Sequence, residues 1–348
     1  LVLFGASGAG KTSIMAKTAL ACSEQVEQGT ANTFLVLRFL GTSDASSTAT
    51  VLLQNLCAHL AALYPEATGS DPAAPETRDL HKLGKEFTKR LAWATKQQHR
   101  LVLFLDSLDQ LGDSDGGRTL DWLPASLPPG VSLVVSTLPE EGGCLDVLRG
   151  RLPSSCFAEV PALPTQASTS ILGAWLQAQG RALAPVQKEL LLTCAAATGL
   201  PLHLRLLYDL SKAWSSWETD SSTLLGEDLS LARTVVGVVT IIFQRLERDH
   251  GQILTAHALG YLTIARHGLS ETELGDLLST DDVVLNDVFE WWDPPVRRIP
   301  PLLWTRLSSD LSEYLVLRGS MGGVSIYAWF HRQFWQEATR RFVPEAEH

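Results

Sequence analysis

The chain has 348 residues, of which 45% are hydrophobic and 19% charged, and a formal net charge of −10. This is the composition of globular domains, so it excludes a disordered chain, and the length is enough for two or three domains. An acidic surface repels phosphate backbones, so we expect no nucleic-acid partner.

Cysteine spacing and the apolar runs indicate the compartment. The five cysteines are scattered without a C-x-x-C pair, which predicts reduced thiols in a cytoplasmic protein and argues against a zinc site. The longest uncharged apolar stretch, residues 234–243, is too short for a bilayer, which needs about 20 residues, so no membrane segment is expected. Because the chain begins inside an apolar run and not with Met, we interpret it as a piece of a longer protein.

The first segment carries a phosphate-binding pattern. Residues 1–4 are an apolar run typical of a buried strand, and residues 5–12, GASGAGKT, fit G-x-x-x-x-G-K-[ST] at every fixed position. Glycines allow positive φ, so successive N–H groups point into one concavity at a helix N-terminus, where phosphate binds. Two other glycine motifs fail, because G-x-G-x-x-G needs Gly at Ser13 and G-x-S-x-G needs Gly at Ala9. The remaining alternative is a Gly/Ser loop with a chance lysine.

This pattern assigns roles to its residues. Lys11 is expected to reach the β- and γ-phosphates of a nucleotide and to act in catalysis, and the Thr12 hydroxyl to bind Mg²⁺. The predicted nucleotide-binding residues of this segment are Gly5, Ser7, Gly8, Ala9, Gly10, Lys11, Thr12 and Ser13.

A second strand supplies carboxylates. Residues 101–105 are continuously apolar, and Asp106 follows at the carboxyl end, where open α/β sheets bind ligands. We expect Asp106 to hold Mg²⁺ directly or through water, and Asp109 to accept a proton from the attacking water. The alternatives are a strand-end turn residue for Asp106 and a helix N-cap for Asp109.

Further strands and helices alternate up to residue 162. Strands are predicted at residues 33–41, 131–137 and 156–163, and helices at 48–63 and 80–96, which indicates a mostly parallel sheet covered on both faces. Ser136 and Thr137 end one strand as γ-phosphate sensors or as strand-end caps. No N-K-x-D element follows a strand, so adenine is favoured over guanine.

The remainder is predicted to be helical and then to form a winged helix. A helical domain is expected at 163–230, where Gly199 ends one helix and Pro201 opens the next. A winged-helix domain is expected at 231–348, with a Ser270–Glu273 capping box, a hairpin turning at 319–323, and His331 opening the last helix. Arg297, Arg298 and Arg306 could suggest DNA contacts, but with the neighbouring Trp and Pro residues we expect them to be buried in salt bridges.

These stretches together resemble the NACHT NTPases of the STAND class, and most of all the NACHT- and WD-repeat-containing proteins. The resemblance rests on the stretches GASGAGKT, LRFLGTSDASS, LFLDSLDQL, VVSTLPE, GLPLHLRLL, LSETELGDLLS, WWDPPVRRIPPLLWTRL and WFHRQF, which extend over almost the whole chain. It implies a P-loop sheet domain (1–162) followed by a helical lid and a winged helix.

The resemblance also implies roles that spacing alone does not give. Pro201 would pack on the adenine, and His331 would touch the β-phosphate of ADP; without the family, His331 is a helix-start residue that caps its own helix. Two positions depart from the family pattern. Gln110 stands where relatives carry a carboxylate, and Leu138 where many carry Arg, so fast hydrolysis and γ-phosphate sensing by Arg are not expected.

The resulting hypothesis is a nucleotide switch. ADP would favour a closed monomer, exchange for ATP would open the chain for self-association, and slow ATP hydrolysis would reset it. The alternative is a hydrolysis-deficient ADP-bound scaffold for protein–protein interaction. Either reading needs adenine nucleotide and Mg²⁺, and places effector and repeat domains elsewhere in the full-length chain.

Overall fold

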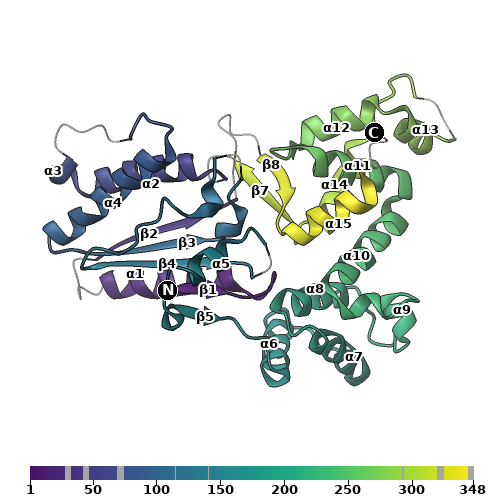
Figure 1. The fold of residues 1–348 in the computed structure, drawn as a ribbon. Helices are drawn as coiled ribbons and strands as arrows, with labels where there is room; N and C mark the ends of the chain where they lie inside the picture. The colour runs from purple at the N-terminus through teal and green to yellow at the C-terminus, as the bar shows by residue number, and fades with distance from the viewer. Residues whose placement is uncertain are drawn as a thin grey trace. The chain divides into compact units, whose positions relative to one another are not determined.

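The computed structural model describes residues 1–27, 33–41, 47–68, 74–113, 115–139, 141–291, 294–319 and 325–343. They form two compact units, Leu1–Ala162 and Leu163–His348. The first unit is built on a five-stranded sheet and the second is mostly helical (Figure 1). The division of the second unit into a domain at 163–230 and another at 231–348 stays a prediction.

The sheet of the first unit is parallel throughout. Its strands are β1 (Val2–Phe4), β2 (Thr33–Phe39), β3 (Arg100–Asp106), β4 (Val131–Thr137) and β5 (Phe157–Glu159). They lie in the order β2-β3-β4-β1-β5, and every pairing is parallel, which agrees with the predicted mostly parallel sheet. Phe39 pairs with Asp106 and Phe4 with Thr137, so the carboxyl ends meet at one edge.

The last strand is shorter than the predicted 156–163. A 3₁₀ turn occupies Ser154–Cys156 before it, and Pro161 follows soon after it. Proline has no N–H to donate to a neighbouring strand, which explains the early end.

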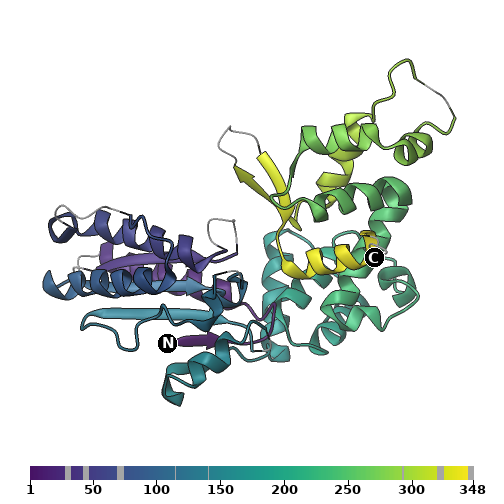
Figure 2. The same ribbon diagram turned by 45° about the horizontal axis from the view of Figure 1, so that its top comes forward.

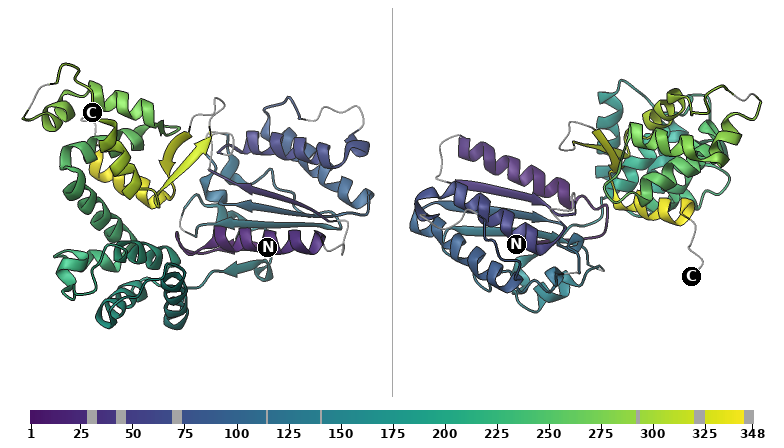
Figure 3. Two further views of the ribbon diagram at one scale, coloured as in Figure 1. Left: turned by 180° about the vertical axis from the view of Figure 1, so that it is seen from behind. Right: turned by 90° about the horizontal axis from the view of Figure 1, so that it is seen from above.

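Helices cover both faces of this sheet (Figures 1 and 3). The helix α1 (Lys11–Glu27) lies on one face, where Met15 packs with Phe104. On the other face α2 (Ala49–Leu63), α4 (Leu80–Lys96) and α5 (Cys144–Arg149) pack on Leu103 and Leu105; the short α3 (Pro65–Thr68) follows α2. Alternate residues of β3 therefore point into two different cores, which is why its sequence is continuously apolar.

The second unit begins with helices, as predicted for the region from residue 163, and includes a short helix at Ser221–Leu225 that was not predicted. They are α6 (Thr165–Ala178), α7 (Pro185–Ala196), α8 (Pro201–Ser211), α9 (Ser221–Leu225) and α10 (Val235–His250). The helical spacing of apolar residues predicts a helix at 230–248, but Leu231–Arg233 form a 3₁₀ turn and α10 starts after Thr234. The Thr234 hydroxyl accepts the N–H of Gly237 at 3.0 Å and so caps the helix.

The rest of the unit is a set of helices with a small antiparallel sheet (Figure 2). Its helices are α11 (Gln252–Ile264), α12 (Glu271–Thr280), α13 (Asp282–Val288), α14 (Pro301–Asp310) and α15 (Arg332–Phe342). Its strands β6 (Leu269–Ser270), β7 (Leu315–Gly319) and β8 (Ser325–Trp329) lie in the order β6-β8-β7. The predicted capping box of Ser270 and Glu273 is present, while the turn of the hairpin lies outside the described residues.

Aromatic packing joins the helices of this unit to its sheet. Phe243 of α10 lies 5.8 Å from Trp329 of β8 and 6.0 Å from Phe334 of α15, measured between ring centroids. Trp329 and Phe334 stack at 5.8 Å, and all three side chains are buried. Such pairs add to the free energy of burying the rings, so this cluster holds α10, β8 and α15 together.

The arginine cluster is not buried, contrary to the prediction. Arg306 is exposed, and the Arg297 and Arg298 side chains are 39% and 56% exposed. Two of the three form the expected ion pairs, because Arg298 donates to Asp276 at 2.5 Å and Arg297 Nη1 lies 3.9 Å from Asp282 Oδ1. Trp291, one of the neighbours expected to bury them, is itself 90% exposed.

Among the described residues, no helix combines the length and the apolar character needed to cross a bilayer.

Candidate nucleotide-binding site

The loop between β1 and α1 has the backbone that its glycines predict. Gly8 and Gly10 have φ angles of 80° and 92°, which L side chains rarely adopt. Ala9 N–H donates to the Ala6 carbonyl at 3.1 Å within the loop, and α1 begins directly after it at Lys11. The exposed amides of such a loop and the first turn of α1 form a suitable site for an anion.

Lys11 folds back over this loop. Its Nζ donates to the carbonyl of Gly5 at 2.7 Å and to that of Ala6 at 3.0 Å, and the residue is 8% exposed. Burial lowers the pKa of Lys11, while the charges of Asp109 and Asp106 oppose this shift. A buried ammonium group held by two carbonyls gains strongly from an added anion, which is the role expected of this lysine.

The two predicted metal ligands lie in direct contact. Thr12 of α1 donates its hydroxyl to Asp106 Oδ2 at 2.6 Å, and Asp106 at the end of β3 is 2% exposed. Ser136 near the end of β4 donates to Asp106 Oδ1 at 2.5 Å and accepts the N–H of Ser107 at 2.8 Å. Ser136 therefore orients the carboxylate toward Thr12.

This donor set fits Mg²⁺ bound together with a phosphate. Hydroxyl and carboxylate oxygens are its preferred ligands, and Mg²⁺ commonly keeps only one or two protein ligands beside phosphate and water. In the described part of the chain no group of three His, Cys, Asp or Glu side chains could hold a metal ion alone. Thr12 and Asp106 would thus supply the protein share of a site that a nucleotide completes.

Asp109 is engaged on both carboxylate oxygens. Oδ1 accepts the N–H of Leu138 at 3.1 Å, and Oδ2 accepts the side-chain amide of Gln110 at 2.8 Å. The residue lies in a 3₁₀ turn, Leu108–Gln110, and is 4% exposed. The N–H groups that it binds do not belong to the start of its own helical turn, so it is not the N-cap that was considered. Its carboxylate instead ties this turn to the end of β4.

Glycine 41 supports this arrangement in a way that the sequence did not reveal. It follows β2 with a φ of 72°, and a Cβ there would lie 2.7 Å from the Cβ of Gln110. A side chain at residue 41 would therefore displace Gln110, which contacts Asp109. A glycine after a strand is a common turn signal, so nothing in the pattern pointed to this contact.

Pro201 and His331 belong to the second unit. Pro201 occupies the first turn of α8, after Gly199 with a φ of 64°. His331 is the N-cap of α15, where its Nδ1 accepts the N–H of Gln333 at 3.3 Å, so the self-capping contact considered for it is present. The structure brings Lys11, Thr12, Asp106 and Asp109 together in the first unit, and nucleotide contacts of Pro201 and His331 stay predictions.

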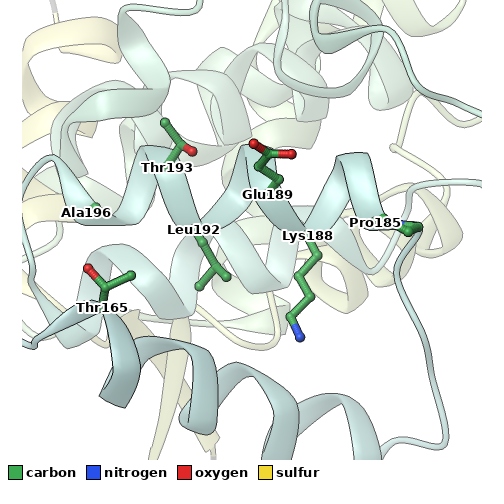
Figure 4. A pocket seen from close by; sticks show the side chains of 7 residues that line it. All are labelled: Thr165, Pro185, Lys188, Glu189, Leu192, Thr193 and Ala196. Carbon is green, nitrogen blue, oxygen red and sulfur yellow. The ribbon is translucent and has the colours of Figure 1, made fainter.

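A surface depression of about 540 Å³ lies on α6 and α7 (Figure 4). Its lining residues are Thr165, Pro185, Lys188, Glu189, Leu192, Thr193 and Ala196. None of the residues predicted to bind nucleotide is among them. The depression is therefore separate from the candidate nucleotide site at the loop between β1 and α1.

The parallel sheet, with this loop after β1 and a carboxylate at the end of β3, defines a P-loop NTPase fold. The NACHT domain model matches residues 1–179, and the chain belongs to this family. A second model, the NWD1-like winged helix-turn-helix domain, matches residues 228–347.

Similar proteins are consistent with this assignment. NACHT domain- and WD repeat-containing protein 1 of Homo sapiens is 36% identical over 100% of this chain and 22% of its own length. NACHT and WD repeat domain-containing protein 2 of Mus musculus is 31% identical over 99% of this chain and 19% of its own length. The chain thus spans about a fifth of these relatives. Among solved structures, the Aeropyrum pernix ORC1 protein in complex with DNA matches with a TM-score of 0.42 at 17% identity, covering 98% of this chain and 87% of that one.

Proposed function

We propose that the chain is an adenine-nucleotide switch that binds ADP or ATP with Mg²⁺ and hydrolyses ATP slowly. The observation that carries the proposal is the geometry around the loop, where Lys11, Thr12 and Asp106 converge. Residues 5–13 would hold the phosphates, and Thr12 and Asp106 would hold Mg²⁺, which supplies neutralisation of phosphate charge. Pro201 and His331 would add contacts to the adenine and the β-phosphate from the second unit.

In this proposal the nucleotide sets an equilibrium between two states. A ligand shifts such an equilibrium only if it binds the two states with different affinity. ADP, with its predicted contact to His331, would favour a closed monomer, and ATP would favour a form that self-associates. Effector and repeat domains elsewhere in a longer chain, in the cytoplasm, would then respond to this change.

A second candidate function is an ADP-bound scaffold without turnover. Asp109 favours it, because both of its oxygens already accept hydrogen bonds from Leu138 and Gln110. A carboxylate that accepts a proton from water must offer it a free lone pair in a suitable direction.

Nucleotide binding is tested by replacing Lys11. We expect Lys11→Ala to weaken ADP and ATP binding by about 10- to 100-fold, because hydrogen bonds to charged groups contribute about 1.5–3 kcal/mol. Isothermal titration calorimetry measures this directly. Lys17→Ala, an exposed lysine on the same helix, is the matched control and should bind as the unmodified chain does. Unchanged affinity of the Lys11 variant would contradict the proposal.

Hydrolysis separates the two candidates. Multiple-turnover phosphate release is expected to be slow but above background in the unmodified chain, and to fall to background in Asp109→Asn. The Asn variant keeps the shape of the side chain and one acceptor oxygen, so nucleotide binding should survive and serve as the control. Equal background rates in both proteins, with nucleotide still bound, would favour the scaffold.

The exposed arginines do not by themselves support DNA binding. Arg297 and Arg298 each already contact a polar or acidic neighbour, Asn286 or Asp276, and the net charge of the chain is −10. The absence of a nucleic-acid partner stays a prediction, which a salt-dependent duplex-binding assay checks.

A further inference from the structure

A buried histidine lies two residues after Pro201. His203 of α8 is 0% exposed and uses both ring nitrogens. Its Nδ1 lies 2.8 Å from the Thr198 hydroxyl oxygen, and its Nε2 lies 3.0 Å from the carbonyl oxygen of Ala232. The ring therefore connects the turn before α8 with the 3₁₀ turn Leu231–Arg233 before α10.

Donor and acceptor chemistry gives this connection one direction. A carbonyl oxygen only accepts, so Nε2 carries the hydrogen, and Nδ1 accepts from the Thr198 hydroxyl. The Thr198 oxygen in turn accepts the N–H of Leu200 at 3.2 Å. Burial lowers the pKa of His203, which agrees with a neutral ring in this arrangement. A continuous chain of hydrogen bonds thus runs from Leu200 to Ala232.

Both ends of this chain are connected to neighbouring segments. At the first end, the Gly199 carbonyl accepts the N–H of Leu163 at 2.7 Å, which connects the turn at residues 199–201 to the segment before α6. At the second end, the 3₁₀ turn packs directly on α10, since a Cβ on Gly237 would lie only 2.1 Å from the Leu231 carbonyl oxygen. A shift of the turn before α8 would therefore displace or release the start of α10.

We infer that Thr198 and His203 are positioning residues that fix the turn carrying Pro201 and couple it to the first turn of α10. This inference rests on the proposed function, because Pro201 is the predicted adenine contact. Nucleotide that orders the turn at 199–201 then also orders the start of α10, from which the matched winged-helix segment continues. Thr198 and His203 would thus connect the binding of the adenine base to the start of α10.

The test compares Thr198→Val with Thr198→Ser. Valine keeps the shape but removes both hydrogen-bonding roles, whereas serine keeps the hydroxyl, and Thr198 is only partly buried, so both should fold. We expect Thr198→Val to weaken ADP binding about five- to tenfold, because the two hydrogen bonds that position the turn carrying Pro201 are lost. Inorganic tripolyphosphate, which has no base to place on Pro201, should bind both variants and the unmodified chain equally.

Hydrogen exchange distinguishes coupling from a local structural role. In the unmodified chain and in Thr198→Ser, ADP should slow amide exchange of residues 231–238 about tenfold or more. In Thr198→Val, ADP should leave exchange at 231–238 unchanged. A merely structural role would speed exchange with and without ADP by the same factor. His203→Gln, which retains a donor near the position of Nε2 but has no Nδ1 acceptor, should behave like Thr198→Val.

The outcomes separate the two proposals. If the unmodified chain binds neither ADP nor tripolyphosphate, the proposed function fails. If it binds ADP while Thr198→Val and His203→Gln retain the same ADP affinity and the same ADP-dependent protection at 231–238, the coupling is overturned and the proposed function stands.

Discussion

Ser136 is the residue on which the orientation of Asp106 depends. Its hydroxyl is fully buried, donates to Asp106 Oδ1 and accepts the N–H of Ser107. No other hydroxyl among the described residues contacts both groups. The side chain at this strand end thus acts on the carboxylate that is predicted to bind Mg²⁺, whereas the sequence alone had suggested phosphate sensing or capping.

Replacing Ser136 should therefore cost stability. Ser136→Ala leaves a buried carboxylate oxygen and a backbone N–H without their partner, which costs about 1–3 kcal/mol. Urea-induced unfolding measures the loss. Ser132→Ala, an exposed serine on the same strand, should stay within about 0.5 kcal/mol of the unmodified chain. Equal stability of both variants would show that water replaces the hydroxyl.

His203 should make stability depend on pH. Burial lowers its pKa from the usual 6.5, and the hydrogen bond to Ala232 opposes this only in part. The unfolded chain therefore binds a proton that the folded chain does not, so stability is complete above pH 6.5 and declines as pH falls below it, by at most about 1.4 kcal/mol per pH unit. Urea unfolding between pH 7 and 5 should show a shallower decline for His203→Gln. Parallel slopes for the two proteins would rule this out.

At the scale of elements, two helical glycines predict opposite effects of one substitution. A Cβ on Gly237 of α10 would meet the Leu231 carbonyl oxygen at 2.1 Å, whereas a Cβ on Gly275 of α12 meets nothing within 4 Å. Gly275→Ala should stabilise the chain by roughly 0.5–1 kcal/mol, the helix-propensity gain. Gly237→Ala should destabilise it by about 2 kcal/mol or more, because backbone must move. Thermal unfolding measures both variants. Unfolding temperatures that shift in the same direction for Gly275→Ala and Gly237→Ala would refute the prediction.

The sequence predicted those elements whose ends and faces carry local signals. Residues 48–63 and 80–96 form helices as expected, because Thr48 and Asp79 cap them and one face of each is apolar. The helix α13 was not predicted, since it is short and its cap, Asp281, follows directly on α12. The exposure of Arg298 was also missed, because it depends on how distant helices pack.

The candidate site divides in the same way. Lys11 and Thr12 come from one contiguous motif, and Asp106 from the end of a strand, so the parallel topology was enough to bring them together. The contacts of Gln110 with Asp109 and of His203 with Ala232 depend on tertiary approach that no spacing encodes. Sequence motifs and secondary-structure propensity thus predict which residues lie at the site, whereas tertiary packing determines which hydrogen bonds their side chains form.

At the scale of the molecule, each unit has its own buried core. In the first, clusters on the two sheet faces extend from Val2 to Val160, and in the second a single cluster extends from Leu163 to Phe342. Units with separate cores commonly unfold as separate cooperative steps. We therefore expect calorimetry of the chain without nucleotide to show two transitions.

Calorimetry with added nucleotide should then show whether the nucleotide binds one unit or both. If ADP contacts residues 5–13 together with Pro201 and His331, it should raise the temperatures of both transitions. At an ADP concentration one hundred times the dissociation constant, the free energy of unfolding should rise by about 2.7 kcal/mol in total. Tripolyphosphate should raise only the transition temperature of the first unit. At the same ADP concentration, Lys11→Ala should show the total stabilisation reduced to about 0.4–1.4 kcal/mol. If ADP shifts only the transition of the first unit, the nucleotide does not contact the second unit. The proposed closed state would then have to be stabilised by contacts other than those of the nucleotide.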